Sequence, residues 1–228
     1  MTAGPLALIG GGEWTDACTF DRDLLARAGT DEVVVLPTGS AYENPGKVTA
    51  RAVEWFEALG AKVVEAKVLA RPDAKLDEQV EVVRRARFIY LAGANALHLR
   101  SVLKDTPVFD AILAAWRDGA VLAGTNAGAD VLCDPMVDAR GGAFTVGLGL
   151  IPGLAIIPRS DTWSPEKVHR TVELVPRNVT LAAIPEQTAL ILDAGGSWRV
   201  EGVGEVSVWV AGKPSTVEDL GRLVTPPV

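Results

Sequence analysis

The chain has 228 residues, of which 48% are hydrophobic and 22% charged, a balance typical of folded globular proteins and not of disordered ones. Its 22 basic and 29 acidic residues give a net charge of −7, so we expect neither a nucleic acid nor an anionic membrane surface as a partner. Two cysteines and two histidines exclude a disulfide framework and a zinc cluster, and no metal or other cofactor is expected. No signal peptide and no apolar stretch of about 20 residues is evident, so the sequence predicts a cytoplasmic protein.

Short apolar runs alternate with helical patterns through the first half of the chain. Runs typical of buried strands lie at residues 6–9, 33–36, 62–68, 88–91 and 120–123. Helical patterns lie between them, at residues 15–28, 45–59, 73–86, 96–103 and 107–117. In the third of these patterns, Leu76, Val80 and Val83 are predicted to point inward. The alternation predicts an α/β fold: a doubly wound, mostly parallel sheet with helices on both faces.

The pattern changes after residue 123. One helix is predicted over residues 165–174. Short strands separated by turn residues are predicted at 179–184, 188–192, 198–201 and 205–210. We expect these four strands to add antiparallel to the edge of the main sheet. With no internal repeat and no linker, the sequence predicts a single domain over residues 1–228, with a loose tail at 225–228.

Residues 121–130 contain the most informative motif, Gly124-Thr125-Asn126-Ala127-Gly128. A strand that enters Gly-x-x-x-Gly and leaves as a helix has the form of a nucleophile elbow, in which the central side chain stands exposed above the sheet on a strained backbone. An active hydrolase has serine or cysteine there. This chain has Asn126, whose amide nitrogen is not a usable nucleophile because its lone pair is delocalised. On these five residues alone, a simple tight turn explains the glycines equally well.

The segment 124–129 resembles the Gly-Thr-Ser-Ala-Gly-Ala elbow of the S51 peptidases, a family that includes aspartyl dipeptidase (peptidase E) and cyanophycinase. Five further segments resemble that family in the same order along the chain: Gly10-Gly11-Gly12 and residues 88–95, 148–153, 184–190 and 200–206. The resemblance covers nearly the whole chain. It implies a class I glutamine amidotransferase-like α/β fold and a serine-peptidase ancestry.

The chain departs from the family pattern at two of its three chemical positions. Asn126 stands where the family has its nucleophilic serine, and Arg159 stands where the family has its histidine. Only the acid, Glu186, is retained. Because acyl transfer on this scaffold needs a hydroxyl activated by a neutral imidazole, the resemblance implies a catalytically inactive homologue, a pseudoenzyme.

The remaining groups suggest a binding site without chemistry. Arg159 and Glu186 should lie within salt-bridge reach, and Arg159 either neutralises Glu186 or holds an anionic ligand. The resemblance places Gly93, Ala94 and Ala127 as oxyanion or ligand-binding positions, with Ser160 close by. The expected partner is a small acidic or dipeptide-like ligand, and a homodimer is compatible with the sequence.

A rearranged active site is the alternative hypothesis, in which an active dipeptidase or cyanophycinase-type hydrolase uses Ser160 or Thr125 with His169. It requires a hydroxyl within about 3.2 Å of a histidine nitrogen. We expect His169 to be a surface residue instead and Cys133, seven residues after Asn126 along the following helix, to face the core. His98 could line the pocket, but that is not the expected outcome. Asp130 and Asp138 are further acidic candidates, although we expect such residues to be solvated.

Overall fold

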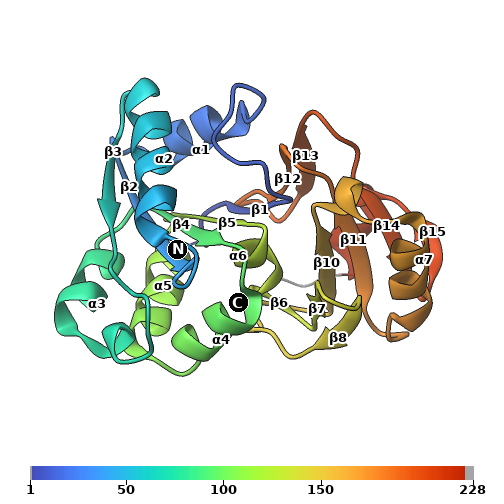
Figure 1. Ribbon diagram of the computed structural model, residues 1–228. Helices are drawn as coiled ribbons and strands as arrows, with labels where there is room; N and C mark the ends of the chain where they lie inside the picture. Colours follow the sequence, from blue (N-terminus) through green and yellow to red (C-terminus); the bar gives the residue numbers. More distant parts are fainter. Residues whose placement is uncertain (1, 224–228) are drawn as a thin grey trace.

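The computed structural model describes residues 2–223, with side chains to residue 220, so the tail at 225–228 lies outside it. Its centre is a seven-stranded sheet in the order β13-β12-β1-β5-β4-β2-β3 (Figure 1). Five strands of this sheet are parallel: β1 (Leu6–Ile9), β2 (Glu32–Gly39), β3 (Lys62–Glu65), β4 (Phe88–Gly93) and β5 (Val121–Thr125). Two antiparallel strands, β12 (Thr188–Leu192) and β13 (Trp198–Gly202), extend it beyond β1, as predicted.

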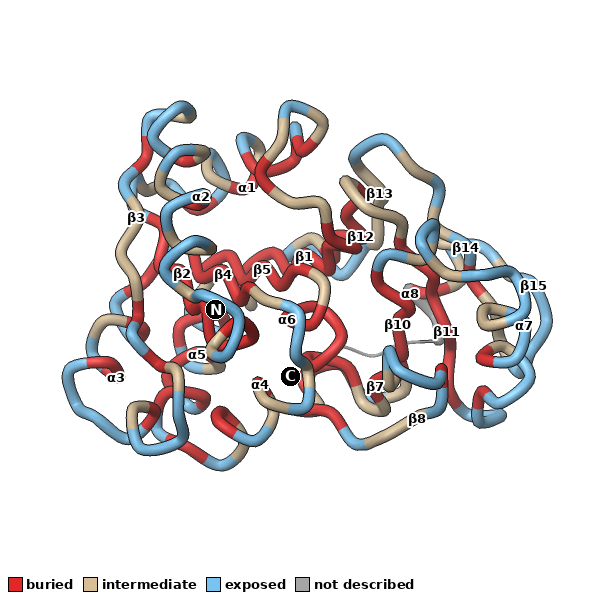
Figure 2. The backbone as a smooth tube through the Cα atoms, in the orientation of Figure 1, coloured by how far each residue is buried: buried red, intermediate tan, exposed pale blue. Residues whose placement is uncertain are grey.

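Helices cover both faces of this sheet. On one face lie α1 (Phe20–Ala28) and α2 (Pro45–Ala58), and on the other lie α3 (Asp77–Arg84), α4 (Ala96–Leu103) and α5 (Pro107–Arg117). Within β2, Val33 and Val35 belong to the core under α1 and α2, whereas Val34 and Leu36 belong to the core under α3, α4 and α5. Both sets are buried, and the central strands are drawn in red, the colour of buried residues, in Figure 2. This burial on both faces explains why the strands read as continuous apolar runs. The doubly wound, mostly parallel sheet predicted from the sequence is confirmed.

A second sheet of four strands stands beside the first (Figure 1). It contains β10 (Leu154–Pro158), β11 (Thr180–Ile184), β14 (Ser207–Val210) and β15 (Lys213–Ser215), in that order. Helix α7 (Pro165–Leu174) covers one face, where Ala155 and Leu181 are buried, and Ile156 and Ala182 on the other face join the main core.

The prediction that all four late strands add to the main sheet is therefore wrong for residues 179–184 and 205–210. They form β11 and β14 of the second sheet. The physical reason is β10, a strand that the sequence did not predict, which pairs in parallel with β11. Strands β12 and β13 take the positions beyond β1 in the main sheet, and the backbone groups of β11 pair with β10 and β14 instead.

Short elements connect the two sheets around the elbow. They are α6 (Ala127–Asp130), β6 (Cys133–Asp134), β7 (Met136–Asp138), β8 (Ala143–Thr145), β9 (Ile151–Pro152) and the 3₁₀ turn Ser160–Thr162, with α8 (Val217–Leu223) near the end of the chain. The helix after the elbow is thus only four residues long, and Cys133 lies on a strand instead of the expected second helical turn. Cys133 is buried, as predicted.

Several predicted segments have other bounds in the structure, and the helix predicted from residue 15 begins at Phe20. The strand at 62–68 stops at Glu65, and the helix at 73–86 is divided into a 3₁₀ turn (Asp73–Lys75) and α3. Leu76 lies between these two parts in an extended conformation and is 52% exposed, so its predicted inward orientation is wrong, whereas Val80 and Val83 are buried. Within residues 2–223, none of the helices has the length and apolarity needed to cross a membrane.

Candidate functional site

The elbow has the geometry that its glycines predicted. Asn126, between β5 and α6, has φ 52° and ψ −112°, a conformation that residues other than glycine rarely adopt. A Cβ atom on Gly124 would lie 2.4 Å from the Gly128 carbonyl oxygen, and one on Gly128 would lie 2.2 Å from the Leu91 carbonyl oxygen. Both positions therefore require glycine, because the backbones of β4, β5 and α6 pass too close for any side chain.

The glycine loop after β1 lies between Asn126 and the second sheet. The Gly10 carbonyl accepts a 2.8 Å hydrogen bond from the Arg159 backbone N–H. A Cβ atom on Gly11 would lie 2.8 Å from Arg159 Cγ and 3.8 Å from Asn126 Cβ. Both side chains therefore lie next to Gly11, which brings two of the sequence-predicted site residues together.

Glu186 completes this group. Arg159 Nε donates a 2.7 Å hydrogen bond to Glu186 Oε1, so the two residues form the ion pair that was predicted from the sequence. The Glu186 backbone N–H in turn donates to Asp161 Oδ1 at 2.9 Å. Two roles were left open for Arg159, and in the structure it pairs with Glu186 and neutralises its charge. A guanidinium stays charged at any working pH and cannot accept a proton.

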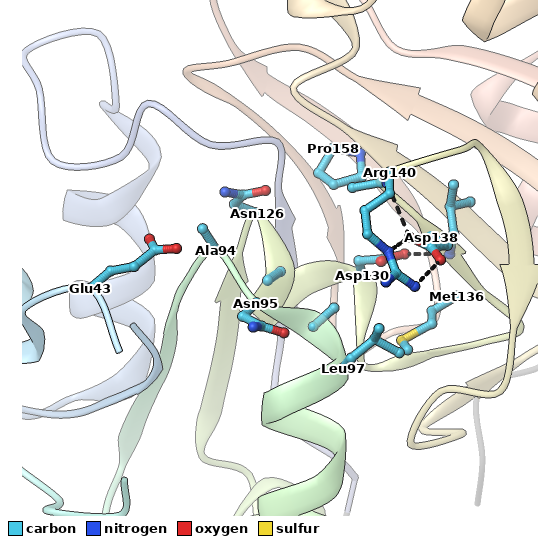
Figure 3. A pocket seen from close by; sticks show the side chains of 14 residues that line it. Glu43, Ala94, Asn95, Leu97, Asn126, Asp130, Met136, Asp138, Arg140 and Pro158 are labelled. Atoms are coloured by element: carbon cyan, nitrogen blue, oxygen red, sulfur yellow. Dashed lines mark hydrogen bonds and ion pairs between the residues drawn. The ribbon is translucent and has the colours of Figure 1, made fainter. Parts of the chain in front are cut away.

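Two cavities meet at Asn126. The first, of about 260 Å³, lies between α4 and the β7–β8 hairpin, and we call it the hairpin cavity (Figure 3). It is lined by Glu43, Ala94, Asn95, Ala96, Leu97, Asn126, Ala127, Asp130, Met136, Val137, Asp138, Ala139, Arg140 and Pro158. The second, of about 270 Å³, lies against the start of α2, and we call it the α2 cavity. It is lined by Glu13, Ser40, Glu43, Asn44, Lys47, Val48, Arg51, Gly93, Ala94 and Asn126.

The predicted ligand-binding positions fall partly at these cavities. Ala94 lines both, Gly93 lines the α2 cavity and Ala127 lines the hairpin cavity, whereas Ser160 lines neither. The Ala94 N–H donates to the Gly39 carbonyl at 3.2 Å, so this donor is already engaged. Arg159 and Glu186 also line neither cavity, and their ion pair stands at the side of the site.

The histidines lie away from both cavities. His169 on α7 has a 74% exposed side chain, and its Nε2 lies 3.3 Å from Glu173 Oε1, as expected for a surface residue. His98 Nε2 lies 2.8 Å from the Leu69 carbonyl oxygen. Thr125 Oγ1 donates to Glu13 Oε2 at 2.9 Å. Among the described residues, neither histidine ring is hydrogen-bonded to a hydroxyl group.

Two carboxylates of the hairpin cavity have opposite environments. Asp130 is buried, and burial raises the pKa of its carboxyl well above the ordinary value, contrary to the expectation of a solvated side chain. Asp138 is held at 2.9 and 2.6 Å by Nε and Nη2 of Arg140, whose hydrogen bonds lower the pKa of Asp138. The spacing of Asp130 was a signal in the sequence. Two residues four positions apart lie on the same side of a helix, so Asp130 was placed on the same side as Asn126.

The cations of the α2 cavity were also missed by sequence reasoning. Arg51 Nη2 donates to the Glu13 carbonyl oxygen at 2.9 Å, and its Nη1 lies 3.8 Å from Glu13 Oε1. Lys47, one turn earlier on α2, forms no ion pair with a described residue. Residues 2–223 contain no cluster of three or more potential metal ligands.

Known proteins resemble the chain over most of its length. The model of Peptidase family S51 matches residues 6–198. Cyanophycinases from Nostoc sp. strain PCC 7120 and from Synechococcus elongatus are 29% and 27% identical over 200 and 195 residues, which cover 82% and 80% of this chain. The matched regions span 66% and 60% of those two relatives.

A solved structure agrees with the family match. The crystal structure of a peptidase from an acI-B1 Actinobacterium is 28% identical, superposes with a TM-score of 0.82, and covers 94% of this chain and 97% of its own. The family match extends from β1 into β13 and includes the elbow and both partners of the Arg159–Glu186 ion pair. The chain belongs to Peptidase family S51.

Proposed function

We propose that this chain is an S51 homologue without peptidase activity that binds a small acidic or peptide-like ligand above Asn126. The observation that supports the proposal most strongly is Asn126 itself, which has the strained elbow conformation but no atom that can attack a carbonyl. Arg159, at the position of the family's histidine, is paired with Glu186 and cannot serve as a base.

Lys47 supports a ligand with an acidic group at one end, although the same cavity is also lined by Glu13, which pairs with Arg51, and by Glu43. Lys47 and Arg51 line the α2 cavity on one side of Asn126, and Lys47 has no acidic partner among the described residues. A carboxylate that enters this cavity would gain a charge-assisted hydrogen bond from Lys47. The remainder of a dipeptide-sized ligand would then lie across Asn126 toward the hairpin cavity.

The alternative, a hydrolase with a rearranged site, has less support. It needs Ser160 or Thr125 to be activated by His169. Thr125 is bonded to Glu13, and His169 is exposed on α7 beside Glu173. Neither Ser160 nor His169 lines a cavity at Asn126.

Binding is tested by the thermal stability of the protein in the presence of aspartyl dipeptides. A ligand at a hundred times its dissociation constant stabilises the folded state by about 2.7 kcal/mol, which is easily measured. We expect Lys47→Ala to reduce the shift and Arg159→Ala to leave it, because Arg159 is not at the cavity. The absence of a shift with any acidic dipeptide would refute the binding role.

The proposed loss of peptidase activity is tested by restoring the family's serine and histidine. Asn126→Ser alone should stay inactive because the serine lacks a base, whereas Asn126→Ser with Arg159→His should recover some hydrolysis of Asp-X dipeptides. Activity in the single variant equal to that of the double variant would mean that another base already serves the site.

A further inference from the structure

We propose that Asp130 is a neutral carboxylic acid that donates a hydrogen bond to an uncharged carbonyl oxygen, of a peptide or carboxamide group, bound in the hairpin cavity. The inference rests on the proposed function in one respect, namely that a ligand enters this cavity. It adds the chemical group that is recognised there and the residue that recognises it.

The position of Asp130 is the first observation. Asp130 is 2% exposed and lines the hairpin cavity. It lies one helical turn after Asn126, and its backbone N–H donates a 3.1 Å hydrogen bond to the Asn126 carbonyl oxygen. Its Oδ1 accepts a 2.9 Å hydrogen bond from the Val137 backbone N–H. Its Oδ2 has no hydrogen-bond partner among the described residues.

The lack of a cation at Asp130 is the second observation. Arg140, the cation of this cavity, is held by Asp138 through Nε and Nη2, as Figure 3 shows, and forms no ion pair with Asp130. A buried carboxylate with one backbone hydrogen bond and no cation is costly to ionise, so the group keeps its proton. Burial raises the pKa of Asp130, and the nearby Asp138 carboxylate raises it further, against the lowering effect of the Val137 N–H.

A protonated Asp130 presents an O–H donor where an ionised one would present only acceptors. Val137 N–H occupies Oδ1, so the proton is best placed on Oδ2, the oxygen without a partner. This is the arrangement by which a buried acid kept neutral can donate a hydrogen bond to a carbonyl oxygen.

The other charges of the cavity select against ions. Arg140 and Asp138 neutralise each other, so an anionic group finds no free cation among the residues that line this cavity, and the remaining carboxylate, Glu43, also lines the α2 cavity. An amide is suited to what remains, since its C=O can accept from Asp130 while its N–H donates to the side-chain oxygen of Asn126. Leu97, Met136 and Pro158 supply an apolar wall for the attached carbon chain.

The protonation state is tested first, without any ligand. In protein labelled with ¹³C at aspartate carboxyl carbons, the Asp130 signal, assigned with Asp130→Asn, should keep the shift of a protonated acid from pH 5 to pH 7.5. The Asp138 signal serves as the internal control and should remain that of a carboxylate. An Asp130 signal that titrates near pH 4 would overturn the proposal.

The hydrogen bond is tested with three probes that share a five-carbon frame: glutaramide, glutarate and pentane-1,5-diamine. The affinities are compared in the Lys47→Ala background, which removes the proposed carboxylate site of the α2 cavity, and there we expect glutaramide to bind most tightly. Asp130→Asn, which retains an N–H donor of the same shape, should change its affinity less than threefold, whereas Asp130→Leu should weaken it roughly fivefold, as for one neutral hydrogen bond. Equal loss of glutaramide affinity in both variants, or preference for the diamine or glutarate once Lys47→Ala has removed the cation of the α2 cavity, would refute recognition of a neutral carbonyl.

The outcomes separate this inference from the proposed function. Hydrolysis of dipeptides by the wild type would refute the proposed loss of activity and leave the Asp130 results unchanged. A titrating Asp130 beside an inactive, ligand-stabilised wild type would refute only the inference. If Asp130→Leu fails to fold, the carboxyl spectrum of the wild type and the Asp130→Asn affinity still decide it.

Discussion

The elbow and the Arg159–Glu186 ion pair flank the same glycine loop, yet different forces maintain them. The elbow is held by buried backbones and by two glycines without room for a Cβ atom, and its central residue, Asn126, has a positive φ. The ion pair is held by one contact between side chains that are 46% and 33% exposed. The strand-to-helix turn is thus fixed by buried backbone packing, whereas Arg159 and Glu186 are partly exposed side chains, and we expect changes in them to have little effect on stability.

The strongest expected effect concerns a buried carboxyl elsewhere in the interior, Asp21 on α1. Trp55 Nε1 donates to its Oδ2 at 3.0 Å, its Oδ1 has no partner, and burial raises its pKa from 3.8 to about 8. The folded state therefore retains a proton that the unfolded state loses above pH 4. The contribution of this residue to stability is full below pH 4 and falls as the pH rises to about 8, by a total on the order of 5 kcal/mol.

The measurement is urea unfolding of the wild type and Asp21→Asn from pH 5 to pH 8. We expect the asparagine variant to gain stability steadily relative to the wild type over this range. A difference in unfolding free energy that stays constant with pH would show that Asp21 is ionised in the folded state. It would also mean that burial perturbs side chains of this protein less than the contrast between the buried elbow and the exposed ion pair assumes.

The next effect tests the rigidity of the elbow directly. Gly128→Ala would place a methyl group 2.2 Å from the Leu91 carbonyl oxygen, so β4 and α6 must separate. We expect a loss of about 3 kcal/mol in the free energy of unfolding. Gly141→Ala is the matched control, since a Cβ atom there meets nothing within 4 Å. Similar stabilities for the two variants would contradict the close packing of the elbow.

A smaller effect of opposite sign is expected at Asn126. Its positive-φ conformation stores strain on the order of 1–3 kcal/mol, which glycine relieves at the cost of some chain entropy. Asn126→Gly should therefore stabilise the protein by about 1 kcal/mol, and Asn126→Ala should not. Calorimetry on both variants checks this, and a destabilised glycine variant would mean that the amide side chain itself supports the fold.

The smallest effect is expected at the ion pair. A double-mutant cycle with Arg159→Ala and Glu186→Ala should give a coupling free energy below about 1 kcal/mol that decreases with added salt, as for other solvent-exposed pairs. A coupling of 3 kcal/mol or more would place the pair among the structural elements of the site and remove the contrast with the elbow.

Much of the site could be predicted from the sequence because its determinants are local. The Gly-x-x-x-Gly pattern requires a tight turn wherever it follows a strand, and the two glycines proved to be sterically necessary. The Arg159–Glu186 ion pair followed from the family resemblance, which specifies which distant segments meet. The continuous apolar runs indicated strands with both faces covered, so the core sheet was also predictable.

The rest depends on tertiary contacts that no local pattern encodes. Residues 154–158 form a strand that pairs with β11, and β11 belongs to the second sheet, while β12 and β13 continue the main sheet beyond β1. Asp130 is buried because the β7 strand covers it and Val137 donates to it. Lys47 and Arg51 read as the solvated face of a helix, and only the fold brings them to the cavity beside Asn126.

The most direct test of the account is the release of amine from Asp-X dipeptides incubated with the wild-type protein, compared with Asn126→Ala under the same conditions. The account predicts that both proteins give the uncatalysed rate, because Asn126 has no attacking atom and Arg159 accepts no proton near neutral pH. Turnover by the wild type that disappears in His169→Ala or Ser160→Ala would contradict it and establish a rearranged catalytic site.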